Sequence, residues 1–390
     1  MRLRNRLWNL GCLLVLLLGN ALWAALAVAQ DQASQASQAS FNAVNLTAGL
    51  PSESLAQQLA TKRVVFVGEI HDRYDHHLNQ LEIIRRLHEI SPAFAIGVEY
   101  FQQPFQAKVD DYIAGRIPEH EFLGATEYYG RWGYDYRLYA PIFRYAREQR
   151  IPVRALNVPA GIASTAARVG LEGLSEEQRA YLPQEIEPAD EGYRRRLRAV
   201  FETHPGSGNF ERFVEAQTVW DAGMAKSAAA YLNADEGRRL VILAGSGHVA
   251  FGSGIPSRLK RLANATHAIV LSAGEEIEPG MADYVLLSGK QELPPAGGLG
   301  VDMQNQDGEC RIRSVTSGGA GEKAGLKKGD VLVALDGQPV KAVADVRLAL
   351  WDKVPGDRVR ISVRRKRLFW AAEHDFDFEL AAARESGEDD

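Results

Sequence analysis

The sequence predicts an α/β protein with a mostly parallel sheet, flanked by helices and carrying a helical insertion or lid, followed by a small β-rich domain. Three observations predict it. From about residue 51, nearly continuous apolar runs alternate with amphipathic stretches, as in βαβ units whose strands are buried on both faces. More than eighty residues of helical pattern separate the third run from the fourth, which is too much chain for one crossover helix. Beyond about residue 296, short alternating segments with turn residues favour a separate β-rich unit.

The elements follow in a simple order. The predicted strands of the first domain, which we place at 51–275, are the runs 63–67, 94–98, 152–156 and 240–244, with 267–271 as a fifth. Helical patterns at 176–181, 193–201 and 210–232 form the insertion. Residues 276–295 contain turn residues typical of a linker. The β-rich domain is expected over 296–382, with alternating segments at 331–337 and 358–363, and an acidic tail over 383–390.

The composition excludes some classes of protein. Of the 390 residues, 46% are hydrophobic and 24% are charged, which is ordinary for a globular chain with more than one domain. The net charge is −5, and the first 29 residues carry three arginines and no acid, so the remainder is more acidic still. We therefore expect no nucleic-acid partner and no bulk attraction to an anionic membrane surface.

The first 29 residues have the layout of a signal peptide. A basic start is followed by an apolar run and by Ala27-Val28-Ala29, a typical cleavage pattern. We expect an exported, periplasmic location, with an uncleaved membrane anchor as the alternative because the apolar stretch is long enough to span a bilayer. Residues 30–50, which include three Gln-Ala-Ser repeats, are expected to be a flexible tether.

Polar residues come directly after four of the predicted strands. Two Gly-X-X-His motifs, at 68–71 and 245–248, follow the first and fourth strands, and Glu99 and Asn157 end the second and third. Carboxyl ends of parallel strands share one edge, where open α/β folds bind ligands. Two histidines and two glutamates there can hold a divalent metal or supply a general acid and base. The predicted cleft residues are Glu69, His71, Glu99, Asn157 and His248.

Residues 60–272 resemble the ChaN family of haem-binding uptake proteins, part of the wider superfamily of Tiki, TraB and erythromycin-esterase-like proteins. The resemblance rests on both Gly-X-X-His motifs, Val98-Glu99, Ala155-Leu156-Asn157 and the segments 132–141 and 216–225. It implies that the protein binds haem or its iron, in haem uptake or handling. The superfamily also contains metal-dependent proteases and ester hydrolases, so the alternative function is a hydrolase whose metal or attacking water is held by His71, His248, Glu69 and Glu99. A third hypothesis is a scaffold with an inactive cleft.

Haem requires an apolar slot, an axial His or Tyr, and cations for its propionates. The aromatic-rich stretch 128–139 and the arginines of 194–198 supply these residue types near the predicted lid. The haem-binding candidates are Tyr134, Tyr136, Arg194 and His204. Packed core rings, a solvated helix face and a loop are the alternatives for these residues.

Residues 296–382 resemble a bacterial PDZ domain. The resemblance rests on the loop Gly298-Leu299-Gly300-Val301 and on the segments 324–332 and 336–340. It implies that the loop N–H groups bind a peptide carboxylate and that a helix at 345–351 forms the second wall, with Val346 and Leu350 facing the peptide. The expected partner is a peptide or a protein C-terminus, with an internal prop or a homodimer contact as the alternative.

Overall fold

The computed structural model describes residues 42–45, 48–49, 52–203, 208–274, 277–366 and 370–383. The predicted signal peptide or anchor, most of the tether, His204 and residues 384–390 of the acidic tail lie outside the described residues. Within the described ranges, no helix combines the length and apolar character needed to cross a membrane.

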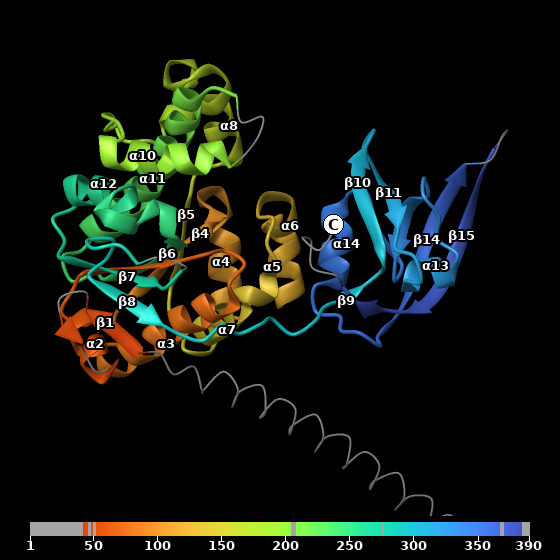
Figure 1. Ribbon diagram of the computed structural model, residues 1–390, viewed down its shortest axis with the longest axis horizontal. Helices are drawn as coiled ribbons and strands as arrows, with labels where there is room; N and C mark the ends of the chain where they lie inside the picture. The colour runs from red at the N-terminus through yellow and green to blue at the C-terminus, as the bar shows by residue number, and fades with distance from the viewer. Residues whose placement is uncertain are drawn as a thin grey trace, which may run out of the picture.

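An eight-stranded sheet organises the first domain, in the order β2-β1-β8-β7-β3-β6-β4-β5 (Figure 1). The strands from β8 to β5 run parallel, and β1 and β2 are antiparallel at one edge. The strands are β1 (Asn42–Asn45), β2 (Ala48–Gly49), β3 (Val64–Glu69), β4 (Ala95–Gln102), β5 (Val153–Asn157), β6 (Leu240–Gly245), β7 (His267–Ser272) and β8 (Tyr284–Leu287). The predicted α/β class is confirmed. Strand β8 lies inside the segment interpreted as a linker, because its first three residues form a buried apolar run that extends the sheet beside β7.

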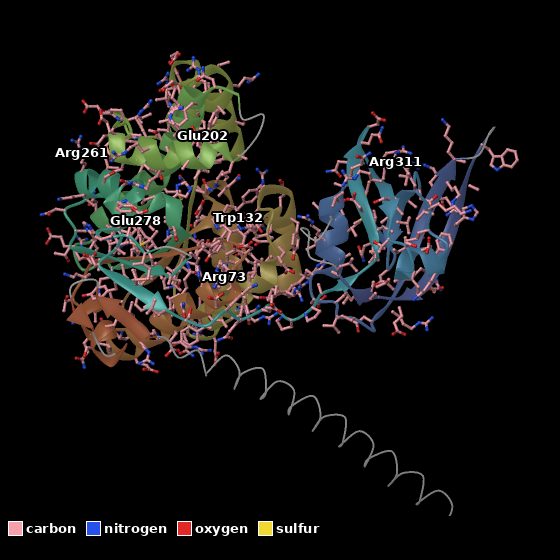
Figure 2. All side chains as sticks on the ribbon, viewed as in Figure 1. Arg73, Trp132, Glu202, Arg261, Glu278 and Arg311 are labelled. Carbon is pink, nitrogen blue, oxygen red and sulfur yellow. The ribbon has the colours of Figure 1, made fainter. Side chains whose placement is uncertain are left out.

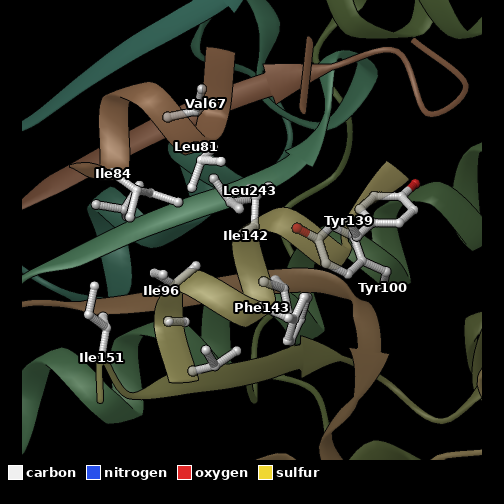
Figure 3. Packing of buried hydrophobic residues seen from close by; sticks show 14 of the residues in the cluster. Val67, Leu81, Ile84, Ile96, Tyr100, Tyr139, Ile142, Phe143, Ile151 and Leu243 are labelled. Carbon is white, nitrogen blue, oxygen red and sulfur yellow. The ribbon is translucent and has the colours of Figure 1, made fainter. Parts of the chain in front are cut away.

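Successive side chains of the central strands point to opposite faces, and different helices cover each face. On one face Val67, Ile96 and Leu243 pack against α3 and α7, as Figure 3 shows. On the other face Phe66 and Ile242 pack against α11 and α12. The first face is covered by α2 (Ser52–Leu59), α3 (Tyr74–Ile90), α4 (Gln106–Ile113), α5 (Glu119–Ala125), α6 (Tyr128–Arg131) and α7 (Ala140–Glu148), and α12 is Ile255–Leu262.

The predicted helical insertion lies between β5 and β6. It comprises α8 (Ala160–Val169), α9 (Glu176–Arg179), α10 (Glu191–Glu202) and α11 (Phe210–Asn233). Asp190 and Asn209 cap α10 and α11 by accepting hydrogen bonds from backbone N–H groups of the first helical turn. Because α11 packs both on α8 through Ala222 and on the sheet through Met224, it holds the insertion against the sheet.

The C-terminal domain is an antiparallel sheet in the order β10-β11-β12-β14-β15, with β13 paired to β12. Its elements are β9 (Gly297–Gly298), β10 (Val301–Gln306), β11 (Glu309–Val315), α13 (Ala320–Ala324), β12 (Val331–Leu335), β13 (Gln338–Pro339), α14 (Val343–Leu350), β14 (Arg358–Lys366), β15 (Ala371–Glu379) and β16 (Ala381–Ala382). Helix α14 begins two residues earlier than expected, because the Asp345 carboxylate accepts hydrogen bonds from the N–H groups of Lys341 and Ala342.

Helix α14 lies beside α5 and α6 of the first domain (Figure 1). Trp351, directly after α14, is only 9% exposed and belongs to the hydrophobic core of the first domain. Its ring centroid lies 5.7 Å from that of Tyr136. Arg347 donates a hydrogen bond to the carbonyl oxygen of Gly133 at 3.1 Å. The side chains Val346 and Leu350 belong instead to the core of the C-terminal domain, so α14 contacts both domains.

Candidate functional site

The predicted cleft residues lie at the carboxyl edge of four neighbouring strands. Strands β3, β6, β4 and β5 are adjacent and parallel, with Glu69 opposite Gly245 and Val98, which precedes Glu99, opposite Leu243. Asn157 lies opposite Gln102 at the end of β5. The parallel topology therefore places all these positions at one edge, as the sequence predicts.

The two Gly-X-X-His motifs pack directly against each other. A Cβ added to Gly245 would lie 2.8 Å from Cε1 of His71, and one added to Gly68 would lie 3.2 Å from Oγ of Ser246. Both distances are shorter than ordinary carbon contacts, so each motif requires its glycine to accommodate the other. The histidines of the two motifs are thus held in one cluster.

His71 is oriented by a buried carboxylate. Its Nδ1 lies 2.6 Å from Oε1 of Glu69, which is 1% exposed. Burial lowers the pKa of His71, but the hydrogen bond and charge of Glu69 outweigh burial, so the pKa is raised. The ring centroids of Trp132 and Tyr134 lie 5.0 and 4.8 Å from that of His71, and Figure 2 labels Trp132. Since Nδ1 is engaged, Nε2 is the ring nitrogen that His71 can offer to a ligand.

His248 is held between two carboxylates. Its Nδ1 lies 2.7 Å from Oδ1 of Asp221 and its Nε2 lies 3.3 Å from Oε1 of Glu99. Burial alone would lower the pKa of His248, but these two acids raise it well above its ordinary value. Burial likewise would raise the pKa of Glu99, but the charge of His248 lowers it to about 2. Both ring nitrogens of His248 therefore face carboxylates, which favour its protonated form.

Asp221 joins the insertion to this cluster. Besides His248, it accepts a hydrogen bond from the hydroxyl of Tyr193 on α10 at 2.8 Å. The guanidinium nitrogen Nη1 of Arg258, on α12, lies 3.8 Å from Oδ2 of Asp221. The sequence places Asp221 in the segment 216–225 that carries the family resemblance, but Asp221 is not among the predicted site residues.

The remaining cleft and haem candidates differ in their surroundings. Asn157 is 7% exposed, and its Oδ1 has no hydrogen-bond partner among the described residues. Tyr134 is 36% exposed and packs on His71. Tyr136 is buried in the core, where its hydroxyl donates to Glu119. Arg194 pairs with Glu211 at 2.5 Å. Among the described haem candidates, Tyr134 is thus the one that packs on a histidine of the cluster.

The structure also tests the metal-binding arrangement. Among the residues that the structure describes, no group of three or more His, Cys, Asp or Glu side chains is arranged to hold a metal ion. A metal ligand must present a deprotonated nitrogen, whereas both nitrogens of His248 face carboxylates. The donor set of the four predicted metal ligands therefore does not fit a divalent metal in this conformation.

The predicted peptide-binding residues lie around strand β10 and helix α14. Gly300 has a φ of +66°, and a Cβ there would lie 3.1 Å from the backbone nitrogen of Ala320, so the turn favours glycine. Strand β10 is the edge strand of its sheet. Gly298 is half-buried in β9 and Val301 begins β10. Leu299, Val346 and Leu350 pack in the core of the C-terminal domain.

The Glu99–His248 pair predicts how stability depends on pH. The Glu99 contribution is fully present above its ordinary pKa of 4.5 and is lost as pH falls towards about 2. The His248 contribution is fully present below 6.5 and is lost as pH rises through its raised pKa. We therefore expect the Glu99→Gln/His248→Gln double variant to lose part of the pH dependence of wild-type stability at both extremes. Urea unfolding across the pH range measures this. Curves that differ from wild type by the same amount at every pH would contradict it.

Comparisons with known protein families match both domains. The family model described as haem-binding uptake, Tiki superfamily, ChaN matches residues 55–259, which is just over half of the chain. The PDZ domain model matches residues 297–368.

Individual proteins show more distant similarity. A solved structure of ChaN from Campylobacter jejuni, described as binding haem cofacially, superposes with a TM-score of 0.53 at 17% identity, covering 64% of this chain and 97% of that one. The chain is 25% identical to RETICULATA-RELATED 5 of Arabidopsis thaliana over 240 residues, covering 55% of this chain and 32% of that protein. It is 29% identical to the periplasmic serine endoprotease DegQ of Escherichia coli over 157 residues, covering 40% and 32%.

The chain spans about a third of the length of these curated relatives. The structural likeness supports the fold, and the family model supports membership independently of it. The first domain carries both Gly-X-X-His motifs at one sheet edge, and a PDZ domain follows it. This chain belongs to the ChaN family of haem-binding uptake proteins in the Tiki superfamily.

Proposed function

We propose that this protein binds haem over His71 and that its PDZ domain recruits a peptide partner. The observation that carries the haem proposal is the Glu69–His71 pair at 2.6 Å, flanked by Trp132 and Tyr134 at the open edge of the sheet. Membership of a haem-binding family supports the same ligand.

The residues around His71 fit this ligand. A histidine whose Nδ1 is held by a carboxylate presents a more basic Nε2, which suits axial coordination. Tyr134 offers a partly exposed ring and a phenol oxygen on the same side. The guanidinium of Arg196, on α10, donates a hydrogen bond to Oγ of Ser253 at 2.7 Å and stacks on Phe251. Ser253 comes five residues after His248 in the sequence. It is therefore a better candidate than Arg194 for pairing with a propionate. When bound, haem supplies an iron that accepts an axial nitrogen or oxygen.

A haemin titration tests the proposal. We expect a saturable Soret shift for the wild type and an affinity about tenfold weaker for His71→Ala, because the variant lacks the Nε2 ligand. Tyr134→Phe keeps the ring and removes the oxygen, so it reports whether Tyr134 coordinates the iron. His120→Ala is the matched control, since His120 is exposed on α5 away from the cluster. A wild-type titration that matches an unrelated acidic protein would overturn the haem proposal.

A hydrolase is the second candidate function, and the Glu69–His71 pair supports it as well. A carboxylate-oriented imidazole such as His71 can take a proton from water through Nε2. Ester hydrolysis by the haem-free protein, abolished in His71→Ala and retained in His120→Ala, would support this candidate. Absence of ester hydrolysis by the haem-free wild type would argue against this candidate.

The PDZ proposal rests on the Gly298–Val301 loop beside the open edge of β10. Backbone N–H groups of such a loop bind a carboxylate, and an edge strand pairs with an extended peptide. We expect the full chain to bind peptides with an apolar C-terminal residue and a free carboxylate. Amidation of that carboxylate should weaken binding about tenfold, because the loop loses a charged acceptor. Fluorescence polarisation with paired peptides measures this, and equal affinity for both forms would argue against the loop.

We further propose that the protein is exported. The signal-peptide layout of residues 1–29 supports this location, and so does the periplasmic location of DegQ. The alternative, a membrane anchor formed by the same segment, places the two described domains in the same compartment. N-terminal sequencing of the mature chain distinguishes cleavage after Ala29 from retention of the segment.

A further inference from the structure

A cavity of about 390 Å³ lies outside the histidine cluster. It is formed by the edge strand β5, the C-terminal half of α11, the segment after α9 and the residue that precedes β6 by two positions. Its volume falls in the range of small-molecule sites. The lining residues are Gln103, Arg154, Ala180, Tyr181, Lys226, Ser227, Ala230, Tyr231 and Arg238.

The charge of this cavity is entirely positive. Arg154, Lys226 and Arg238 line it, and no aspartate or glutamate does. None of these three cations forms a salt bridge with any residue that the structure describes, although the chain as a whole is acidic. Positive charges gathered in a concave site raise the local concentration of anions. The three residues come from separate elements, so only the fold brings them together.

The cations are held in place by neighbouring groups. The guanidinium groups of Arg154 and Arg238 lie 5.8 and 4.8 Å from the ring centroid of Tyr231. Lys226 donates to the carbonyl oxygens of Ala180 and Leu182 at 2.7 and 2.9 Å, which leaves one ammonium hydrogen for a ligand. The guanidinium of Arg238 donates a hydrogen bond to the carbonyl oxygen of Tyr231 at 3.2 Å. Cation–π contacts and hydrogen bonds of this kind lower the entropy lost when a ligand binds.

We propose that this cavity binds the phosphate group of a small phosphorylated ligand. A monocarboxylate would neutralise one of the three positive charges, whereas a phosphate monoester carries nearly two negative charges at neutral pH. Its oxygens match the forked N–H groups of Arg154 and Arg238. The volume exceeds that of phosphate alone, so Tyr181 and Ser227 can contact the organic part.

Isothermal titration of the full chain with glycerol 3-phosphate tests this inference. We expect saturable binding that weakens as salt concentration rises, and acetate binding at least about tenfold weaker. Arg154→Met should reduce the affinity for glycerol 3-phosphate about tenfold, because it removes a charge-assisted hydrogen-bond donor. The Arg154 guanidinium makes no hydrogen bond to the described residues, so this variant should fold; its melting temperature checks that. Arg168→Met, at an exposed position on α8, is the control and should bind like the wild type.

A lipid source of the phosphate is distinguished by a second arm with phosphatidylglycerol vesicles. If the protein binds these vesicles but not glycerol 3-phosphate, and Arg154→Met weakens vesicle binding, the phosphate belongs to a lipid headgroup. That result would still support the proposed phosphate site. Absence of saturable binding in both arms, or equal losses in Arg154→Met and Arg168→Met, would overturn the inference. Lys226→Met provides a second test of the site and should weaken binding in whichever arm shows it.

Discussion

Replacing Asp221 by asparagine is expected to lower the free energy of unfolding of the ChaN domain by about 3 kcal/mol, because it removes one of two counter-charges from a buried imidazolium. Asp221 is fully buried and contacts both His248 and the Tyr193 hydroxyl. The substitution also weakens the attachment of α10 to the sheet edge. Thermal and urea unfolding followed by circular dichroism measure the loss, and NMR titration of His248 should show a lower pKa.

Asp235→Asn is the matched control for this prediction. Asp235 lies just beyond the end of α11, is exposed, and accepts a hydrogen bond from the N–H of Gly237 that asparagine can also accept. We expect its unfolding to match the wild type within about 0.5 kcal/mol. Equal stability of Asp221→Asn and Asp235→Asn would show that the Asp221 charge does not stabilise the cluster.

Replacing Trp351 by alanine is expected to remove about 3 kcal/mol of stabilisation from the contact between the two domains, because it empties a large buried site. The indole is 9% exposed, packs on Tyr136 and lies beneath the Arg144 guanidinium at 5.8 Å. The chain should become more extended in small-angle scattering. Limited proteolysis should also cut faster at 288–296, the segment between β8 and β9.

Trp370 provides the control for the domain contact. It is 61% exposed, so Trp370→Ala should leave both the scattering profile and the cleavage rate unchanged. If Trp351→Ala behaves like Trp370→Ala, the indole does not hold the domains together. Since α14 carries Val346 towards the PDZ core and Arg347 towards Gly133, the variant Arg347→Ala should show a smaller change in the same direction.

Much of the site follows from the sequence because parallel strands impose a simple rule. Buried apolar runs identify β3, β4, β5 and β6, and residues that follow such strands must lie at one edge of the sheet. Glu69, His71, Glu99 and His248 could therefore be assigned to one place without coordinates. The PDZ resemblance likewise locates Gly300, whose left-handed backbone explains why glycine is required.

What the sequence by itself determined was the α/β class, the shared sheet edge and the two-domain order, since periodicity and strand-end position depend on neighbours along the chain. The tertiary structure decided which distant residues meet. Tyr134 packs on His71 whereas Tyr136, two residues later, is buried against Trp351. Asp221 reaches His248 from the insertion, and the three cations beside Tyr231 come from separate elements. Such contacts depend on helix packing and loop paths, which local patterns do not encode.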